Sequence, residues 1–252
     1  MRHHRALIWS CVALVTVLAW AYLIHLDHRM SAVTTTDSVM ERMGMATGES
    51  WNASDVFFTF AMWAVMMIGM MAPAAAPVIL IFTEMRNARG DARAPARGAL
   101  FGVAHISVWI GFAAAAALLQ WALHQAAVLS PSMTITSSHL AGAMLIAAGA
   151  YQLSPVKGEC LRRCQNPLGF LVTNWRDGAS GALKLGIRHG VYCLGCCWAL
   201  MLVLFIAGVM NLVAVAALTV FILLEKLGPS GARVAQAGGI AMILCGAFIL
   251  LS

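Results

Sequence analysis

The sequence contains few charged residues for its length. Asp, Glu, Lys and Arg together make up 10% of its 252 residues, whereas hydrophobic residues make up 61% and the mean hydropathy is +0.83. A soluble domain carries about 25% charged residues, so this composition excludes an ordinary soluble enzyme, a disordered chain and a small disulfide-stapled secreted domain. We therefore predict an all-α fold, a polytopic bundle of transmembrane helices with the lipid bilayer as its main partner.

Acidic side chains are scarce within the apolar stretches, where only Glu225 stands at an edge. Hard cations prefer oxygen ligands, and proton-coupled transporters use buried carboxylates, so the sequence disfavours both classes. The chain also lacks the phosphate-binding, nucleophile-elbow and dinucleotide-binding fingerprints. We therefore expect no enzyme activity, no catalytic residues and no organic cofactor.

Seven apolar stretches bounded by charged residues predict seven membrane spans in one transmembrane domain over residues 1–252. The spans cover about 6–24, 56–82, 99–121, 135–153, 190–209, 211–225 and 234–251. Only Met210 and Asn211 separate the fifth span from the sixth, so six spans with a re-entrant hairpin is the alternative. The first stretch is too long for a typical signal-peptide core, which favours a retained helix over a cleaved signal.

Basic residues predict the direction of the spans. Fourteen of the 16 Lys and Arg residues fall on one side when seven spans alternate, which leaves only Arg29 and Arg42 on the other. The positive-inside rule therefore predicts a cytoplasmic N-terminus, an extracytoplasmic loop at 25–55 and a basic cytoplasmic loop at 154–189. The same rule accounts for the formal charge of +6 without a nucleic-acid partner.

Soft metal donors gather at the start of the fifth span. Helical neighbours recur three and four residues apart, so one helix stripe carries His189, Cys193, Cys196, Cys197 and Met201. A Cys-x-x-Cys pair with an upstream His is typical of sites for soft metals. The rise of about 1.5 Å per residue separates His189 from Cys197 by roughly 12 Å. A single ion therefore needs ligands from another helix, or the stripe forms successive stations. We interpret the isolated Cys11 and Cys245 as packing residues.

The second span carries a second set of sulfur donors. Two rows of thioethers follow helical spacing, one with Met62, Met66 and Met70 and the other with Met67 and Met71. Pro73 and Pro77 remove two helical hydrogen bonds beside them, and broken backbone of this kind often lines transport sites. By rise per residue the rows reach the depth of Met201, and His105 in the third span reaches that of Cys193. Packing around a kink and, for His105, interhelical hydrogen bonding are the alternative interpretations.

Two further clusters lie in the predicted loops. The extracytoplasmic one consists of Met40, Met43 and Met45. Thioethers favour Cu(I), although an amphipathic segment at the membrane surface would show the same pattern. The cytoplasmic cluster is the pair Cys160 and Cys164, which are spaced to chelate a metal, and disulfides are rare in a reducing cytoplasm. We expect the neighbouring Arg162 and Arg163 to lower the pKa of both thiols.

Four segments of the chain are distinctive in combination. They are the span-two pattern M-W-x-x-M-M-x-x-M-M-x-P-x-x-x-P, the stretch Y-C-L-G-C-C-W at Tyr192–Trp198, and the segments Gly208–Asn211 and Leu224–Lys226. Together they resemble the bacterial family of predicted metal-binding integral membrane proteins of unknown function, over roughly residues 55–250. The resemblance implies a helical protein of the bacterial inner membrane. As metal ligands it implies Met66, Met67, Met70, Met71, Cys193, Cys196 and Cys197.

These observations lead to one main hypothesis and two alternatives. The main hypothesis is a membrane protein that binds a soft metal, Cu(I) before zinc, for transport or for delivery to a soluble metal-handling protein. Its route would run from the Met40–Met45 cluster through the span-two thioethers and the Cys193 stripe to Cys160 and Cys164. One alternative is a transmembrane thiol–disulfide shuttle through Cys193 and Cys196. The other is a non-catalytic membrane subunit that docks a soluble metal-loading partner.

Overall fold

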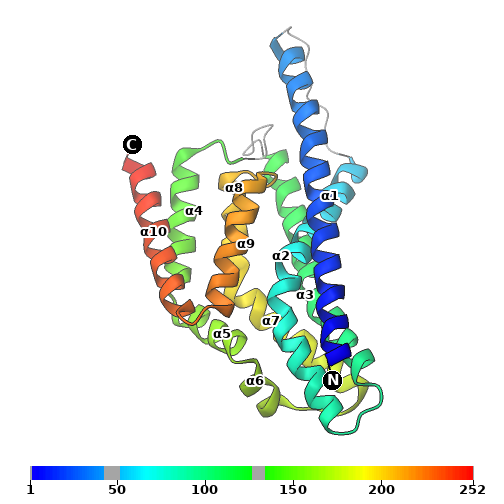
Figure 1. The fold of residues 1–252 in the computed structure, drawn as a ribbon. Coiled ribbons are helices and arrows are strands. Elements are labelled where there is room, and N and C mark those ends of the chain that lie inside the picture. Colours follow the sequence, from blue (N-terminus) through cyan, green and yellow to red (C-terminus); the bar gives the residue numbers. More distant parts are fainter. Residues whose placement is uncertain (1, 43–51, 127–133, 252) are drawn as a thin grey trace.

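The computed structural model describes residues 2–42, 52–126 and 134–251, and over these ranges it contains helices and no β-strand. Figure 1 shows their arrangement. In chain order the helices are α1 (Arg2–Arg42), α2 (Ala53–Ala88), α3 (Ala94–Gln125), α4 (Ser138–Gln152), α5 (Pro155–Gln165), α6 (Pro167–Asn174), α7 (Gly178–Leu202), α8 (Leu204–Ala207), α9 (Leu212–Leu227) and α10 (Gly231–Leu251). The predicted all-α class is confirmed.

Helices occupy all seven positions at which the sequence predicts spans. In the described part of the chain, five segments are long and apolar enough to cross a membrane: Ala6–Arg29, Ala53–Ala88, Ala94–Gln125, Gly178–Ala207 and Gly231–Leu251. The remaining two, α4 with 15 residues and α9 with 16, fall short of that length. Five candidate spans are thus present, while the total of seven and the direction of the N-terminus stay predictions.

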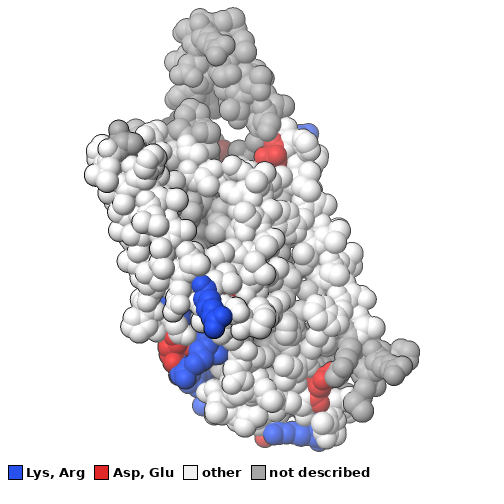
Figure 2. Space-filling view, turned by 60° about the vertical axis from the view of Figure 1, so that its left-hand side comes forward, with Lys and Arg blue, Asp and Glu red and all other residues white. Residues whose placement is uncertain are grey.

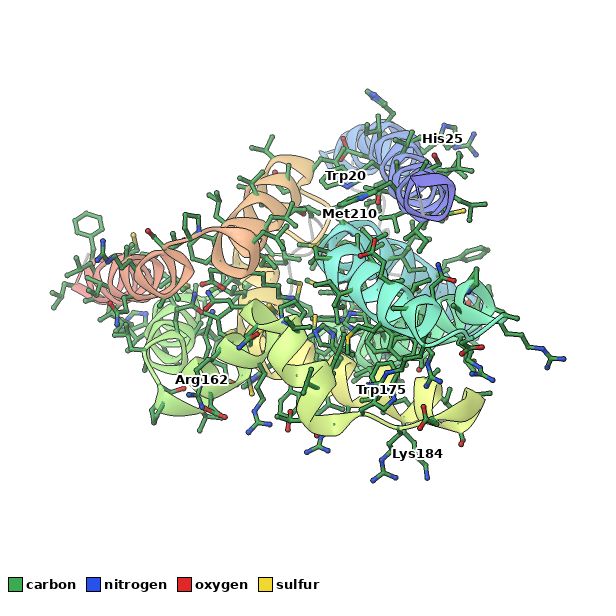
Figure 3. The ribbon with its side chains drawn as sticks, turned by 60° about the horizontal axis from the view of Figure 1, so that its bottom comes forward. Trp20, His25, Arg162, Trp175, Lys184 and Met210 are labelled. Atoms are coloured by element: carbon green, nitrogen blue, oxygen red, sulfur yellow. The ribbon has the colours of Figure 1, made fainter. Side chains whose placement is uncertain are left out.

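The two ends of the bundle differ in the segments that they carry. The N-terminus, the connection from α2 to α3, and helices α5 and α6 lie at one end, and the C-terminus lies at the other (Figure 1). Lys and Arg gather toward the first of these ends on the face shown in Figure 2. Viewed from that end, Arg162 and Lys184 point away from the bundle (Figure 3). This arrangement agrees with the predicted grouping of the basic loops.

The basic segment predicted as a loop at 154–189 is helical instead: it forms the short helices α5 and α6 and, from Gly178, the first turns of α7. Pro155 and Pro167 open α5 and α6, where a residue without a backbone N–H costs no helical hydrogen bond. The hydroxyl of Ser154 accepts from the backbone N–H of Lys157, and the amide oxygen of Asn166 caps α6. Proline in the first turn is therefore compatible with the start of each of these helices.

Two other boundaries differ from the predictions in detail. Residues 25–42 continue α1 instead of opening a loop. The chain reverses between α8 and α9 close to the predicted corner, because Gly208 adopts a φ of +96° that favours glycine. Asn211 then caps α9, and its side-chain oxygen accepts from the backbone N–H groups of Val213 and Ala214 at 3.1 Å.

Close approach of α7 to α3 sets the positions of the candidate ligands. A Cβ at Gly186 would overlap the backbone carbonyl of Phe101, and one at Gly190 would lie 3.0 Å from the carbonyl oxygen of His105. Small residues at this interface allow the two backbones to meet. The α2 helix continues through both Pro73 and Pro77, so the predicted break in its backbone is wrong. It also packs against α3, and its methionines and the α7 cysteines belong to one core.

Candidate metal centre

The predicted α7 stripe lies inside the bundle. The side chains of His189, Cys193, Cys196, Cys197 and Met201 are each at most 3% exposed. The sulfur atoms of Cys196 and Cys197 lie 3.3 Å apart. All seven cysteines are free thiols. The stripe is therefore a buried row of soft donors, as its spacing predicts.

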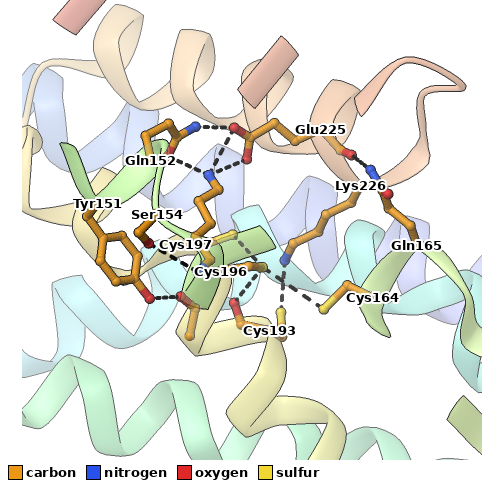
Figure 4. Close-up of polar contacts among 12 residues, drawn as sticks. Tyr151, Gln152, Ser154, Cys164, Gln165, Cys193, Cys196, Cys197, Glu225 and Lys226 are labelled. Carbon is orange, nitrogen blue, oxygen red and sulfur yellow. Dashed lines mark hydrogen bonds and ion pairs between the residues drawn. The ribbon is translucent and has the colours of Figure 1, made fainter. Parts of the chain in front are cut away.

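A thiol from outside the stripe completes a donor pair. Cys164 of α5 places its Sγ 4.0 Å from the Sγ of Cys196 (Figure 4). Two metal–sulfur bonds of about 2.3 Å hold their sulfur atoms at most roughly 4.6 Å apart, so one ion can bridge either Cys164 and Cys196 or Cys196 and Cys197. Among the described residues, no group of three or more His, Cys, Asp or Glu side chains is arranged to hold a metal. The centre that the structure describes therefore consists of pairs of thiols.

Lys226 of α9 contacts both a cysteine of α7 and a methionine of α2. Its buried ammonium donates to the Sγ of Cys193 at 2.9 Å and lies 3.8 Å from the Sδ of Met71. A cation at this position balances negative charge on a thiolate in a medium of low dielectric constant. Lys226 was not assigned to the centre from the sequence. A lysine next to Glu225 at the end of an apolar helix nevertheless indicates a buried charge that needs a partner.

The two thioether rows of α2 are buried as predicted. Their members Met62, Met66, Met67, Met70 and Met71 are at most 6% exposed and belong to the same core as the α7 cysteines. Met71 places its sulfur atom 3.8 Å from the ammonium of Lys226. The rows therefore lie beside the thiols, and their role as metal ligands stays a prediction.

Two histidines meet across the interface of α3 and α7. The Nδ1 atoms of His105 and His189 lie 3.1 Å apart, so one ring donates the proton and the other accepts it. Both Nε2 atoms are buried without a hydrogen-bond partner. The interhelical hydrogen bond expected for His105 is present. The ring that donates from Nδ1 leaves its Nε2 unprotonated, and the ring that accepts at Nδ1 carries its proton on Nε2.

Comparison with known proteins identifies the family. The family model PpoB2, described as copper chaperone, matches residues 60–249. The chain belongs to this copper chaperone family. No curated protein and no solved structure matches it. The match covers the α2 methionines, Cys160, Cys164 and the α7 stripe, so copper handling, which the sulfur pattern predicted, is supported at the level of the family.

The two thiols of α5 have different environments. Cys160 packs against Gly195, where a built Cβ would lie 2.9 Å from its Sγ. The predicted lowering of the pKa by the neighbouring arginines is wrong, because burial raises the pKa of the Cys160 thiol more than Arg163 lowers it. Both arginines also pair with Glu159, which offsets their charge. The pKa of the Cys164 thiol is raised as well, chiefly by its hydrogen bond with Cys193.

A buried ion pair holds α5 against the bundle. Lys157 of α5 donates to both carboxylate oxygens of Glu225 in α9, at 3.0 and 2.9 Å, and both side chains are at most 1% exposed. Gln152 hydrogen-bonds to each partner, and Gln165 donates to the backbone carbonyl of Glu225 at 2.7 Å (Figure 4). Sequence reasoning noted Glu225 only as an edge residue.

The sequence contains two further sets of sulfur residues. Met43 and Met45, and the side chain of Met40, fall outside the described residues, so the predicted capture cluster stays a prediction. Cys11 and Cys245, which the sequence suggests are packing residues, are exposed and do not pack inside the bundle.

Proposed function

We propose that this protein is a membrane-embedded copper chaperone that binds Cu(I) through thiolates of α5 and α7 and delivers it to a soluble metal-handling protein. The observation that carries the proposal is the 4.0 Å separation of Cys164 and Cys196, which lie on different helices and form a pair that one ion can span. Membership of a copper chaperone family supports the metal and the activity.

The donor set favours Cu(I) over zinc. Structural zinc sites are closed by four ligands in a tetrahedron, and the described residues hold no such group. Thiolates and thioethers select soft Cu(I), and this core contains cysteines and methionines. Met71 and Cys193 both lie close to the ammonium of Lys226. Cys197, 3.3 Å from Cys196, supplies an alternative partner for the ion.

The surface of the bundle supports a position in the bilayer. On α10, Leu244, Phe248 and Leu251 are 64%, 73% and 89% exposed, and exposed apolar surface of this kind marks a membrane contact. With the predicted topology, α5 lies at the cytoplasmic face of a bacterial inner membrane. A soluble partner would then reach the centre from the side where Cys164 lies.

The test is Cu(I) binding by detergent-purified protein in competition with bathocuproine disulfonate. Cys196→Ser removes the thiol that both candidate pairs share and should weaken binding by at least about 100-fold, because even the loss of a group that only orients a metal ligand costs 10- to 100-fold. Cys164→Ser should weaken binding less, because Cys197 can still pair with Cys196. Cys245→Ser and Cys11→Ser are matched controls and should bind as wild type does. Wild-type affinity in both Cys164→Ser and Cys196→Ser would refute the proposal.

The thiol–disulfide shuttle is the second candidate, and the same pair favours it. Cys164 and Cys196 would form a disulfide, with an S–S bond of about 2.05 Å, after a closure of roughly 2 Å. Alkylation of the protein directly in cells distinguishes the two functions. A Cys164–Cys196 pair that cycles between oxidised and reduced forms without copper supports the shuttle, and permanently reduced thiols support the chaperone. Unchanged function after replacement of all these donors would instead indicate a docking subunit.

A further inference from the structure

A pocket of about 160 Å³ opens beside the thiol pair. Helices α2, α5, α6, α7 and α9 line it, and its wall includes Cys164, His189, Cys193 and Lys226. The short helices α5 and α6 lie at the end of the bundle that carries the basic segments (Figures 1 and 3). The pocket therefore lies next to Cys164 and Cys193, and part of its wall comes from the two short helices at this end of the bundle.

Two features of the wall indicate what the pocket accepts. The ammonium of Lys226 lies 2.9 Å from the sulfur of Cys193, so the wall already holds a sulfur atom next to a cation. His189 is 3% exposed, and its Nε2 has no hydrogen-bond partner. A buried nitrogen without a partner carries a free-energy cost that an entering ligand can remove. Both features favour a ligand with a negatively charged sulfur or with a bound soft cation.

The size of the pocket limits this ligand. An engineered protein cavity of about 150 Å³ holds one benzene molecule, so the pocket has room for a single side chain or the thiol end of a small molecule. A folded partner could insert one cysteine but no larger element.

We infer that this pocket is the exchange portal of the copper centre, in which Cu(I) arrives or leaves bound to the thiolate of a small thiol or of one inserted cysteine. The inference rests on the proposed function. In each exchange a copper–sulfur bond to Cys164 or Cys196 forms as one to the carrier breaks. A proton that leaves a protein thiol passes to the departing carrier thiolate, and copper stays Cu(I), so no electron moves.

The portal is tested by filling it. Ala74 lines the pocket, and Ala74→Phe should obstruct it without replacing a thiol. Ala72→Phe is the matched control, because Ala72 faces a separate apolar pocket of about 560 Å³ between α1, α2 and α3. Leu227→Trp provides a second obstruction at the rim, where Leu227 is 52% exposed and a larger side chain is tolerated by the fold.

The measurement is the rate of Cu(I) transfer from Cu(I)–glutathione to the detergent-purified protein, followed by stopped-flow mixing. Ala74→Phe and Leu227→Trp should slow transfer by about tenfold or more, with equilibrium Cu(I) affinity unchanged, while Ala72→Phe transfers at the wild-type rate. Wild-type rates in both obstructed variants would overturn the portal and leave the binding site intact. Absence of Cu(I) binding by wild type would instead overturn the proposed function.

Discussion

Removing one partner of the buried Lys157–Glu225 pair should destabilise the protein far more than any surface charge change. Glu225→Gln keeps the volume of the side chain but leaves the ammonium of Lys157 buried at 1% exposure without its carboxylate. Breaking a buried pair from one side typically costs about 3–5 kcal/mol. Gln152 still accepts from Lys157 in the variant, which places the expected loss near the lower end of this range.

A second argument gives the upper limit. An ordinary lysine side chain titrates near pH 10.4, so losing its proton at pH 7 costs roughly 4.6 kcal/mol. If burial of an ammonium costs more free energy than this, the lysine loses its proton and is buried as the neutral amine. The loss of stability therefore cannot exceed roughly 4.6 kcal/mol. A loss of about 3 kcal/mol lowers the midpoint of thermal unfolding by roughly 6–12 °C for a chain of this size.

The assay is tryptophan fluorescence during heating of the detergent-purified protein, with helix content followed by circular dichroism. Glu159→Gln is the matched control, because Glu159 also pairs with basic residues of α5 but is 43% exposed; exposed pairs contribute about 0–1 kcal/mol. Replacing both partners, as Lys157→Met with Glu225→Leu, should recover most of the loss. An unchanged midpoint in Glu225→Gln, or a double variant less stable than Glu225→Gln, would refute the reasoning.

Three further predictions concern the centre and its supports. Lys226→Met should weaken Cu(I) binding by about tenfold or more in chelator competition, because the variant loses the ammonium 2.9 Å from Cys193, and a nearby cation stabilises the thiolates that bind copper; Lys226→Arg should retain more affinity. Gly186→Leu should lower the unfolding midpoint and Cu(I) affinity together, because the side chain would force α7 away from the carbonyl of Phe101. Cys160 should react with N-ethylmaleimide at pH 7 more slowly than a free cysteine, whose pKa is about 8.5, because burial raises the pKa of the Cys160 thiol; mass spectrometry across pH should show labelling that rises only above this value.

Local spacing was sufficient to predict which donors point inward. The α7 stripe and the α2 rows follow the helical repeat, and the residues of that repeat are buried in one core. Helical periodicity predicts such faces because neighbours three and four residues apart share one side of a helix. The same logic placed His105 near the depth of the stripe, where it contacts His189.

The partners that complete the centre could not be predicted in this way. Cys164 and Cys196 are separated by 32 positions, and Cys193 and Lys226 by 33. Their meeting depends on how α5 and α9 pack beneath and beside α7, and no local repeat encodes that packing. The environment of Cys160 was misjudged for a related reason, because Glu159 on the same helix pairs with the arginines that were expected to act on the thiol.

Two successive residues of α9 connect the stability of the bundle with the geometry of the centre. Glu225 holds α5 through Lys157 and through its own carbonyl, and Lys226 contacts the sulfur of Cys193 on α7. The α9 helix therefore contacts both of the helices that carry Cys164 and Cys196. If Cu(I) bridges these thiols, the present 4.0 Å separation lies only about 0.6 Å below the limit of roughly 4.6 Å set by two metal–sulfur bonds. A displacement of α5 by about 1 Å would then break the bridge, so release of copper to a partner requires a small movement of one short helix and no unfolding of the bundle.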